Sequence, residues 1–180
     1  VMVDREGRVT YCNDSLLHLT GWGREEVIGW NWFERFAPPE QGDLEAFLAA
    51  LLGGRSGTSQ HENEILTRSG ERRLVHWNNS VLRSGDGAVV GVASIGEDIT
   101  ERKRVENRLK RLTRVYAMLS QINGLIVRVS GRDELFSEAC RIAVDTGDFK
   151  MAWIGVIDRA TLDGEVVAWS GGEKGDTELV

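Results

Sequence analysis

Cysteine, proline and long apolar runs are all scarce in this 180-residue sequence. The two cysteines, Cys12 and Cys140, lie far apart, which is typical of buried thiols in a cytosolic protein and not of a disulfide framework. No apolar run approaches the length of a membrane span, and no signal peptide opens the chain. We therefore expect a cytoplasmic protein with no membrane insertion in this segment.

Catalytic motifs are absent as well: the sequence holds no G-x-S-x-G, G-x-G-x-x-G, P-loop, H-E-x-x-H or C-x-x-C pattern. Its three histidines, His18, His61 and His76, are scattered over a predicted helix and two predicted strands, as ordinary structural histidines are. Glu62 and Glu64 alternate along one predicted strand near arginines, which indicates a solvated charged edge. The sequence predicts neither an enzyme nor a metal site.

The formal net charge of −6 argues against a nucleic-acid partner for the chain as a whole. One stretch, RKRVENRLKRLTR at residues 102–114, is locally basic. Its spaced leucines and its glutamate favour the flank of a coiled coil over a nucleic-acid arm. The chain opens on Val1 followed by Met2, from which we expect a fragment of a longer protein.

The first hundred residues predict an α+β domain with helices on one face of an antiparallel sheet. A short helix begins at Asn13 or Asp14 and ends at Gly21, and a second helix spans residues 42–52 after Pro38 and Pro39. Two short strands are expected within residues 1–13. Three more are expected at residues 59–68, 71–83 and 88–96, the first two joined by a Ser-Gly hairpin turn.

From Ile99 onward the apolar spacing alternates between four and three residues, which predicts one helix from about residue 100 to 129 with a heptad seam. A helix with such a seam pairs with a second copy, so we expect a homodimer. A lone polar residue in a seam can set register and oligomer state, and Asn123 holds such a position. The expected seam consists of Val105, Leu109, Leu112, Tyr116, Leu119, Asn123 and Ile126.

The stretch VASIGEDITERKRVENRLKRL, residues 92–112, passes from a predicted strand into this helix with no proline or glycine after Gly96. Asp98 can serve as the N-cap with Glu101 as its capping-box partner, and Thr100 is a competing cap. The sequence does not decide between the two caps. Either way, we expect a stiff joint that passes motion of the sheet to the helix.

After Gly131 a second amphipathic helix is expected at residues 132–147, with Leu135 and Ile142 on its apolar face. Two strands are expected at residues 149–158 and 164–172. Two helices and two strands cannot close a sizeable core of their own.

Two separated motifs resemble the PAS family. YCNDSLLHLTGWGREEVIG, residues 11–29, resembles the PAS stretch in which an asparagine opens a helix, and GEDITERKR, residues 96–104, resembles the C-terminal PAC segment. The resemblance implies a PAS sensory domain at residues 1–98, with five antiparallel strands and helices on one face. The N-terminal cap helix common in such proteins would lie before Val1.

The remainder resembles the start of a GAF domain, with MAWIGVID, residues 151–158, as its first core strand. This implies a signalling linker at residues 99–130 and a truncated GAF-like segment at 131–180. The order implies a bacterial sensor protein that ends in a histidine kinase of a two-component system or in a cyclic-di-GMP enzyme. The chain has neither a phosphoacceptor motif nor a GGDEF signature, so the output type stays open.

The PAS resemblance implies two possible cofactors, a LOV-type flavin and haem, and the sequence disfavours both. Flavin photoreceptors of the LOV subclass use a reactive cysteine where this chain has Trp32, and Thr67 and Gly96 stand where flavin-binding amides would be expected. A flavin held without the adduct stays open. Haem sensors commonly place a histidine on the long helix, and residues 42–52 hold none. We expect no cofactor.

What remains is a small organic ligand or no ligand. The indoles of Trp22, Trp30, Trp32 and Trp77 either build an apolar cage or serve as core and interface aromatics. By resemblance, the strand face with Asn78 and His76 looks into the pocket, and the face with Trp77 meets a cap helix, a partner protomer or the linker. The candidate ligand residues are therefore Trp30, Trp32, His76 and Asn78. The predicted function is a sensory module, and the alternative is a ligand-free dimerisation or interaction scaffold.

Overall fold

The computed structural model describes residues 1–40, 42, 44–53, 59–158 and 161–172. The chain forms two compact units, Val1–Arg104 and Val105–Val180. None of the described helices combines the length and the apolar character that a membrane span requires.

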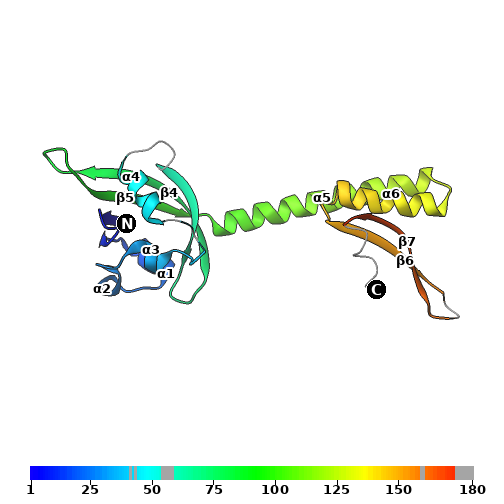
Figure 1. Cartoon of the computed structure of the whole chain (residues 1–180), viewed down its shortest axis with the longest axis horizontal. Helices are drawn as coiled ribbons and strands as arrows, with labels where there is room; N and C mark the ends of the chain where they lie inside the picture. Colours follow the sequence, from blue (N-terminus) through cyan, green and yellow to red (C-terminus); the bar gives the residue numbers. More distant parts are fainter. Residues whose placement is uncertain (41, 43, 54–58, 159–160, 173–180) are drawn as a thin grey trace. The chain divides into compact units, whose positions relative to one another are not determined.

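The first unit is built on the five-stranded antiparallel sheet that the sequence predicts, with strand order β2-β1-β5-β4-β3 (Figure 1). The central strand β5 pairs with β1 on one side and with β4 on the other. The strands are β1 (Met2–Asp4), β2 (Val9–Tyr11), β3 (Gln60–Leu66), β4 (Arg72–Arg83) and β5 (Val89–Asp98).

Among the described residues between β2 and β3 there are four helices: α1 (Asp14–Thr20), α2 (Arg24–Val27), α3 (Trp32–Phe36) and α4 (Leu44–Leu52). The Asn13 side chain accepts a hydrogen bond from the N–H of Leu16, so Asn13 is the cap of α1. Gly21 ends α1 in the left-handed conformation, as predicted. The sequence did not predict α2 and α3.

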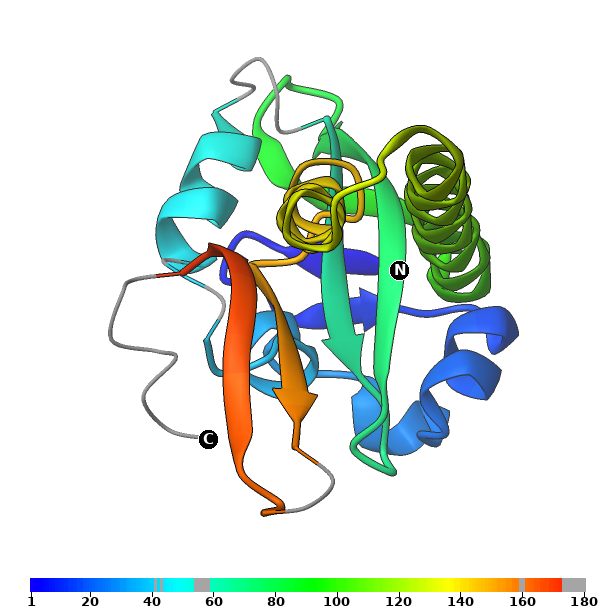
Figure 2. The same ribbon diagram turned by 90° about the vertical axis from the view of Figure 1, so that its right-hand side faces the viewer.

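The turn between β3 and β4 lies beside α1 and α2 (Figure 2). The N–H of Arg68 donates to the carbonyl of Thr20 at 2.7 Å, and its guanidinium pairs with Glu26 at 3.1 Å. These contacts join the far end of the edge strand to the helical layer.

The core lies between these helices and one face of the sheet. Phe36, Ile65 and Val92 are fully buried, and Val75 and Trp77 of β4 are 1% and 5% exposed. The Trp77 face of β4 therefore packs against the helices. The sequence-based assignment, which turned the Trp77 face away from them, is wrong.

The strand β5 and the helix α5 (Thr100–Arg128) are separated only by Ile99, which is fully buried. The N–H of Ile99 donates to the carbonyl of Leu74 on β4 at 2.9 Å. The Asp98 carboxylate accepts from the N–H of Thr100, the first residue of α5, at 2.9 Å and so satisfies a free N–H at the helix start. The Thr100 hydroxyl accepts from the N–H of Leu74 at 2.8 Å, which ties the helix start to β4.

Glu101 does not complete the expected capping box. Its carboxylate bonds the guanidinium of Arg104 one turn further along α5, at 2.6 Å. The expectation of a capping box is therefore wrong. Of the two caps that the sequence left open, Asp98 is the one whose side chain bonds an N–H of the helix.

The second unit contains most of α5, the helix α6 (Arg132–Asp145) and the antiparallel hairpin of β6 (Met151–Ile157) and β7 (Gly164–Gly171). The helix α6 packs along the hairpin and buries Cys140 and Ile142 against it, with Ala168 of β7 (Figure 1). Helix α5 reaches the turn after α6, where Gln121 bonds Thr146 at 3.2 Å.

Candidate functional site

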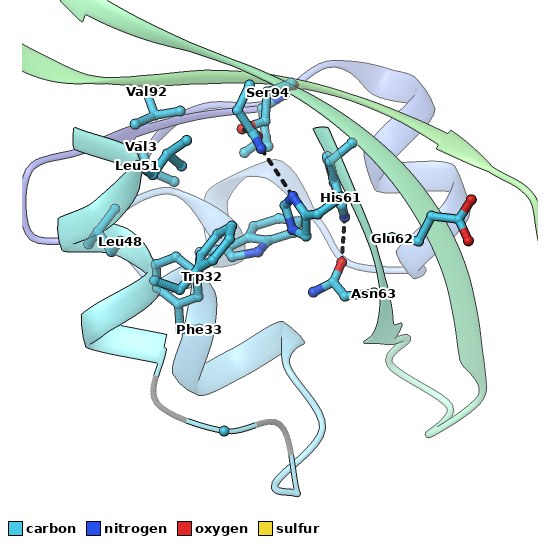
Figure 3. A pocket seen from close by; sticks show the side chains of 15 residues that line it. Val3, Trp32, Phe33, Leu48, Leu51, His61, Glu62, Asn63, Val92 and Ser94 are labelled. Carbon is cyan, nitrogen blue, oxygen red and sulfur yellow. Dashed lines mark hydrogen bonds between the residues drawn. The ribbon is translucent and has the colours of Figure 1, made fainter. Parts of the chain in front are cut away.

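A cavity of about 350 Å³ lies between the sheet of the first unit and helices α3 and α4 (Figure 3). One wall is apolar and largely aromatic. Its side chains come from α3, with Trp32 and Phe33, and from α4, with Phe47, Leu48 and Leu51. A cavity of this size and lining is typical of small-molecule sites.

The opposite wall is polar and comes from three adjacent strands. His61 and Asn63 of β3, Asn79 of β4 and Ser94 of β5 all line the cavity (Figure 3). They share a face because side chains alternate along a strand and the register sets these positions side by side.

Hydrogen bonds fix the orientation of this wall. The Ser94 hydroxyl donates to the Asn79 Oδ1 at 2.6 Å, which turns the Asn79 Nδ2 toward the His61 Nδ1 at 3.1 Å. In that arrangement the Nδ1 accepts, so a neutral His61 ring carries its proton on Nε2.

Trp77 forms the junction of the two walls. Its indole N–H donates to the Asn63 Oδ1 at 2.6 Å, and its ring meets Trp32 edge to face with centroids 5.4 Å apart. On β5 the paired residue is Gly96, and a Cβ there would lie 2.6 Å from the Trp77 ring. Gly96 thus leaves the space that the indole occupies.

The electrostatics of the cavity favour uncharged groups. Burial lowers the pKa of His61, and the nearby charge of a protonated His76 lowers it further. The Phe47 ring covers His61, with centroids 4.6 Å apart. Glu62 lies between His61 and Asn63 on β3, but its carboxylate points away and pairs with Lys103 of α5 at 3.1 Å (Figure 3).

The four predicted ligand residues divide between several places. Trp32 lines the cavity. Trp30 instead packs edge to face on Trp22 beneath the guanidinium of Arg35, and is not among the described lining residues.

His76 and Asn78 lie on the opposite face of β4 from the cavity. Asn78 is exposed and accepts a hydrogen bond from Gln60, and His76 lies 3.8 Å from Glu62. The prediction that their face looks into the pocket is therefore wrong. The reason is that both faces of β4 mix polar and apolar residues, and the burial of the Trp77 indole decides between them.

Sequence reasoning missed the polar wall: His61, Asn63, Asn79 and Ser94. The available signal was the alternation itself, because Asn79 stands two residues from Trp77. Thr67, which was compared with a flavin-binding position, lies in the β3–β4 turn, where its hydroxyl is 3.0 Å from that of Ser69.

Residues 1–104 match the family described as PAS fold, which is more than half of the chain. Over 94% of its length the chain is 27% identical to the bacterioopsin transcriptional activator of Halobacterium salinarum, and it spans 26% of that relative.

Two solved structures match part of the chain. One is an RNA-binding light-oxygen-voltage receptor, with a TM-score of 0.50 and 22% identity over 62% of this chain and 32% of that chain. The other is a sensory box histidine kinase/response regulator from Burkholderia thailandensis, with a TM-score of 0.47 and 23% identity over 61% of this chain and 82% of that chain.

Proposed function

Because this chain belongs to the PAS-fold family, we propose that residues 1–104 are the sensory module of a longer signal-transduction protein. A ligand or partner changes the packing around the cavity. The helix α5 then passes that change to an output domain, either a histidine kinase or a cyclic-di-GMP enzyme. The proposal assigns no catalytic step to this chain and keeps residues 131–180 as the start of a GAF-like domain.

The observation that carries this proposal is the joint between β5 and α5. Only Ile99 lies between them, and it is fully buried and bonded to the main chain of Leu74. Thr100 is 6% exposed and bonds the same residue through its hydroxyl. A joint with this many fixed bonds moves together with β4.

A second contact joins the cavity wall to the same helix through β3. His61 and Asn63 line the cavity, and Glu62 between them pairs with Lys103 in the first turn of α5. Displacement of this part of β3 by a ligand changes the distance between Glu62 and Lys103. The proposed relay thus runs through β3 and β4 as well as through β5, which was the route expected from the sequence.

The helix α5 exposes the apolar seam that the sequence predicts, and we assign this seam to a parallel homodimer. Asn123 in the seam is exposed too. On the outer face of the sheet Ile95 is 77% exposed, which makes that face a second candidate dimer contact. The exposed fractions along the seam are 64% for Val105, 63% for Leu109, 58% for Leu112, 76% for Tyr116, 49% for Leu119 and 57% for Ile126.

The same exposed seam also supports the alternative, a dimerisation scaffold with no relay. A double-mutant cycle on the dimer dissociation constant separates the two functions. Asn79→Ala disturbs the cavity wall, and Thr100→Val removes the hydroxyl bond to β4. If the joint couples cavity and seam, the two changes are non-additive by about 0.5–3 kcal/mol.

Thr113→Val is the matched control, because Thr113 is exposed on the same helix and lies outside the seam. It is expected to add independently to Asn79→Ala. Additivity of Thr100→Val and Asn79→Ala in a dimer that still forms would reject the relay and favour the scaffold. A chain that stays monomeric at high concentration in sedimentation velocity would reject both.

A further inference from the structure

We infer that the cavity takes an uncharged, flat molecule that carries a carbonyl-type hydrogen-bond acceptor, such as a bicyclic aromatic ketone. This inference rests on the proposed function, because it takes the cavity as the sensory site. The ligand binds reversibly as a signal and differs from the flavin and haem cofactors that the sequence disfavours.

An anionic ligand lacks a counter-charge in the cavity. None of the described lining side chains belongs to lysine or arginine, and the sequence holds neither residue between positions 36 and 54. Val1 also lines the cavity, and its main-chain nitrogen donates to the Ser94 carbonyl at 2.9 Å. Burying an unpaired carboxylate here costs more than the apolar contacts return.

A cationic ligand lacks a counter-charge as well. Glu62 is the one acidic residue among the described lining residues, and its carboxylate pairs with Lys103 away from the cavity (Figure 3). Both signs of charge are therefore disfavoured. An uncharged ligand gains from burial of its apolar surface without an ionic desolvation cost.

The flat shape follows from the aromatic wall. Trp32, Phe33 and Phe47 line the cavity from two helices, and Trp77 closes it from the sheet. Aromatic rings contact flat molecules well in stacked and edge-to-face arrangements. A cavity of about 350 Å³ lies near the lower end of small-molecule sites, which suits a molecule of two fused rings.

The acceptor on the ligand follows from His61. Its Nδ1 accepts from Asn79, and no described residue bonds its Nε2. The other ring donor of the wall, the Trp77 indole N–H, is already bonded to Asn63. The His61 Nε2–H is therefore a donor that a ligand can use, and a carbonyl oxygen is its natural partner.

Three matched probes test the inference on the intact 180-residue chain. Chromone is uncharged and carries a carbonyl, naphthalene lacks the acceptor, and chromone-2-carboxylate adds a negative charge. Binding is followed by the NMR shift of the Trp77 indole N–H, with dissociation constants from titration. Chromone is expected to bind about tenfold more tightly than either of the other probes. Naphthalene cannot accept the hydrogen bond from His61, and chromone-2-carboxylate must bury an unpaired charge.

Variants assign the preference to His61. His61→Phe keeps a flat ring but removes the donor, so chromone loses its advantage over naphthalene. His61→Gln keeps a donor and restores part of that advantage. His18→Gln, on the exposed side of α1, leaves the preference unchanged and serves as the control.

Equal binding of chromone-2-carboxylate and chromone would overturn the inference, as would an unshifted Trp77 signal with chromone at millimolar concentration in folded protein. An advantage of chromone that survives in His61→Phe would also overturn it. Chromone that binds as expected but leaves the dimer dissociation constant unchanged contradicts the relay and supports the ligand class, so the two proposals fail separately.

Discussion

The two compact units differ in how far they bury their large apolar side chains. In residues 1–104, Phe36, Ile65 and Ile99 are fully buried. In the described part of residues 105–180, Tyr116 is 76% exposed, and the two tryptophans of the hairpin are 44% and 45% exposed. Those tryptophans, Trp153 and Trp169, face each other across β6 and β7.

Because of this difference, we expect substitutions in the first unit to affect its stability and substitutions in the second unit to affect self-association. The first unit closes its own core, so a change inside it alters its free energy of unfolding. The second unit keeps apolar side chains on the seam of α5 and on the hairpin, where they add little to stability within one chain. Changes there are expected to alter the proposed self-association instead.

The largest effect is expected when the same substitution is made in both units. Trp77→Ala removes an indole that is 5% exposed and is expected to lower the free energy of unfolding of the first unit by about 3–5 kcal/mol. Trp169→Ala removes one that is 45% exposed and is expected to cost under about 1 kcal/mol. Urea denaturation followed by circular dichroism measures both. Similar losses in the two variants would show that the units do not differ in this way.

A smaller effect is expected from adding one methyl group inside the first unit. Gly96→Ala places a Cβ 2.6 Å from the Trp77 ring and is expected to cost about 1–3 kcal/mol. Gly85→Ala is the control, because a Cβ there meets no atom within 4 Å. Urea midpoints that fall equally in both variants would count against the close approach of Trp77 to β5.

In the second unit the expected effect is on association. Asn123→Leu replaces the polar seam residue and is expected to tighten the dimer roughly tenfold, about 1.4 kcal/mol, and to weaken switching in the full-length protein. Ser120→Leu adds the same side chain at an exposed position outside the seam. Sedimentation velocity should separate the two variants, and an equal dissociation constant in both would remove Asn123 from the interface.

The smallest effect concerns pH. Because burial lowers the pKa of His61, the unfolded chain binds a proton that the folded chain does not as pH falls through about 6.5. The stability of the first unit is therefore greatest above that pH and decreases below it. His61→Gln should lose less stability than the natural chain on going from about pH 7.5 to about pH 5.5. His18→Gln should behave like the natural chain.

Most of the fold could be predicted because independent local signals agree. The cap at Asn13, the stop at Gly21 and the Ser69–Gly70 turn each mark an element boundary that the structure has. The helix α3 could not be predicted, since five residues are too few for an apolar period to show. Its cap, Asn31, stands inside a segment crowded with aromatic residues.

The site could be predicted only in part. Alternation separates the two faces of β4 correctly, but it cannot say which face turns inward when both are mixed. That choice depends on Gly96, which makes room for Trp77 from 19 residues further along the chain. Such a pairing is known only once the register of β4 against β5 is known. The polar wall follows from the same register.

The single residue between β5 and α5 also limits how this sensor can be recombined with other proteins. A fusion made at the strand end would replace Ile99 or Thr100 and expose a buried joint. A fusion made further along α5, after Arg104, leaves the first unit whole. Chimaeras should then keep function when the two helices are joined in steps of about seven residues, because that spacing preserves the heptad phase. The best fusion point for exchanging this PAS domain therefore lies inside helix α5 and not at the end of β5.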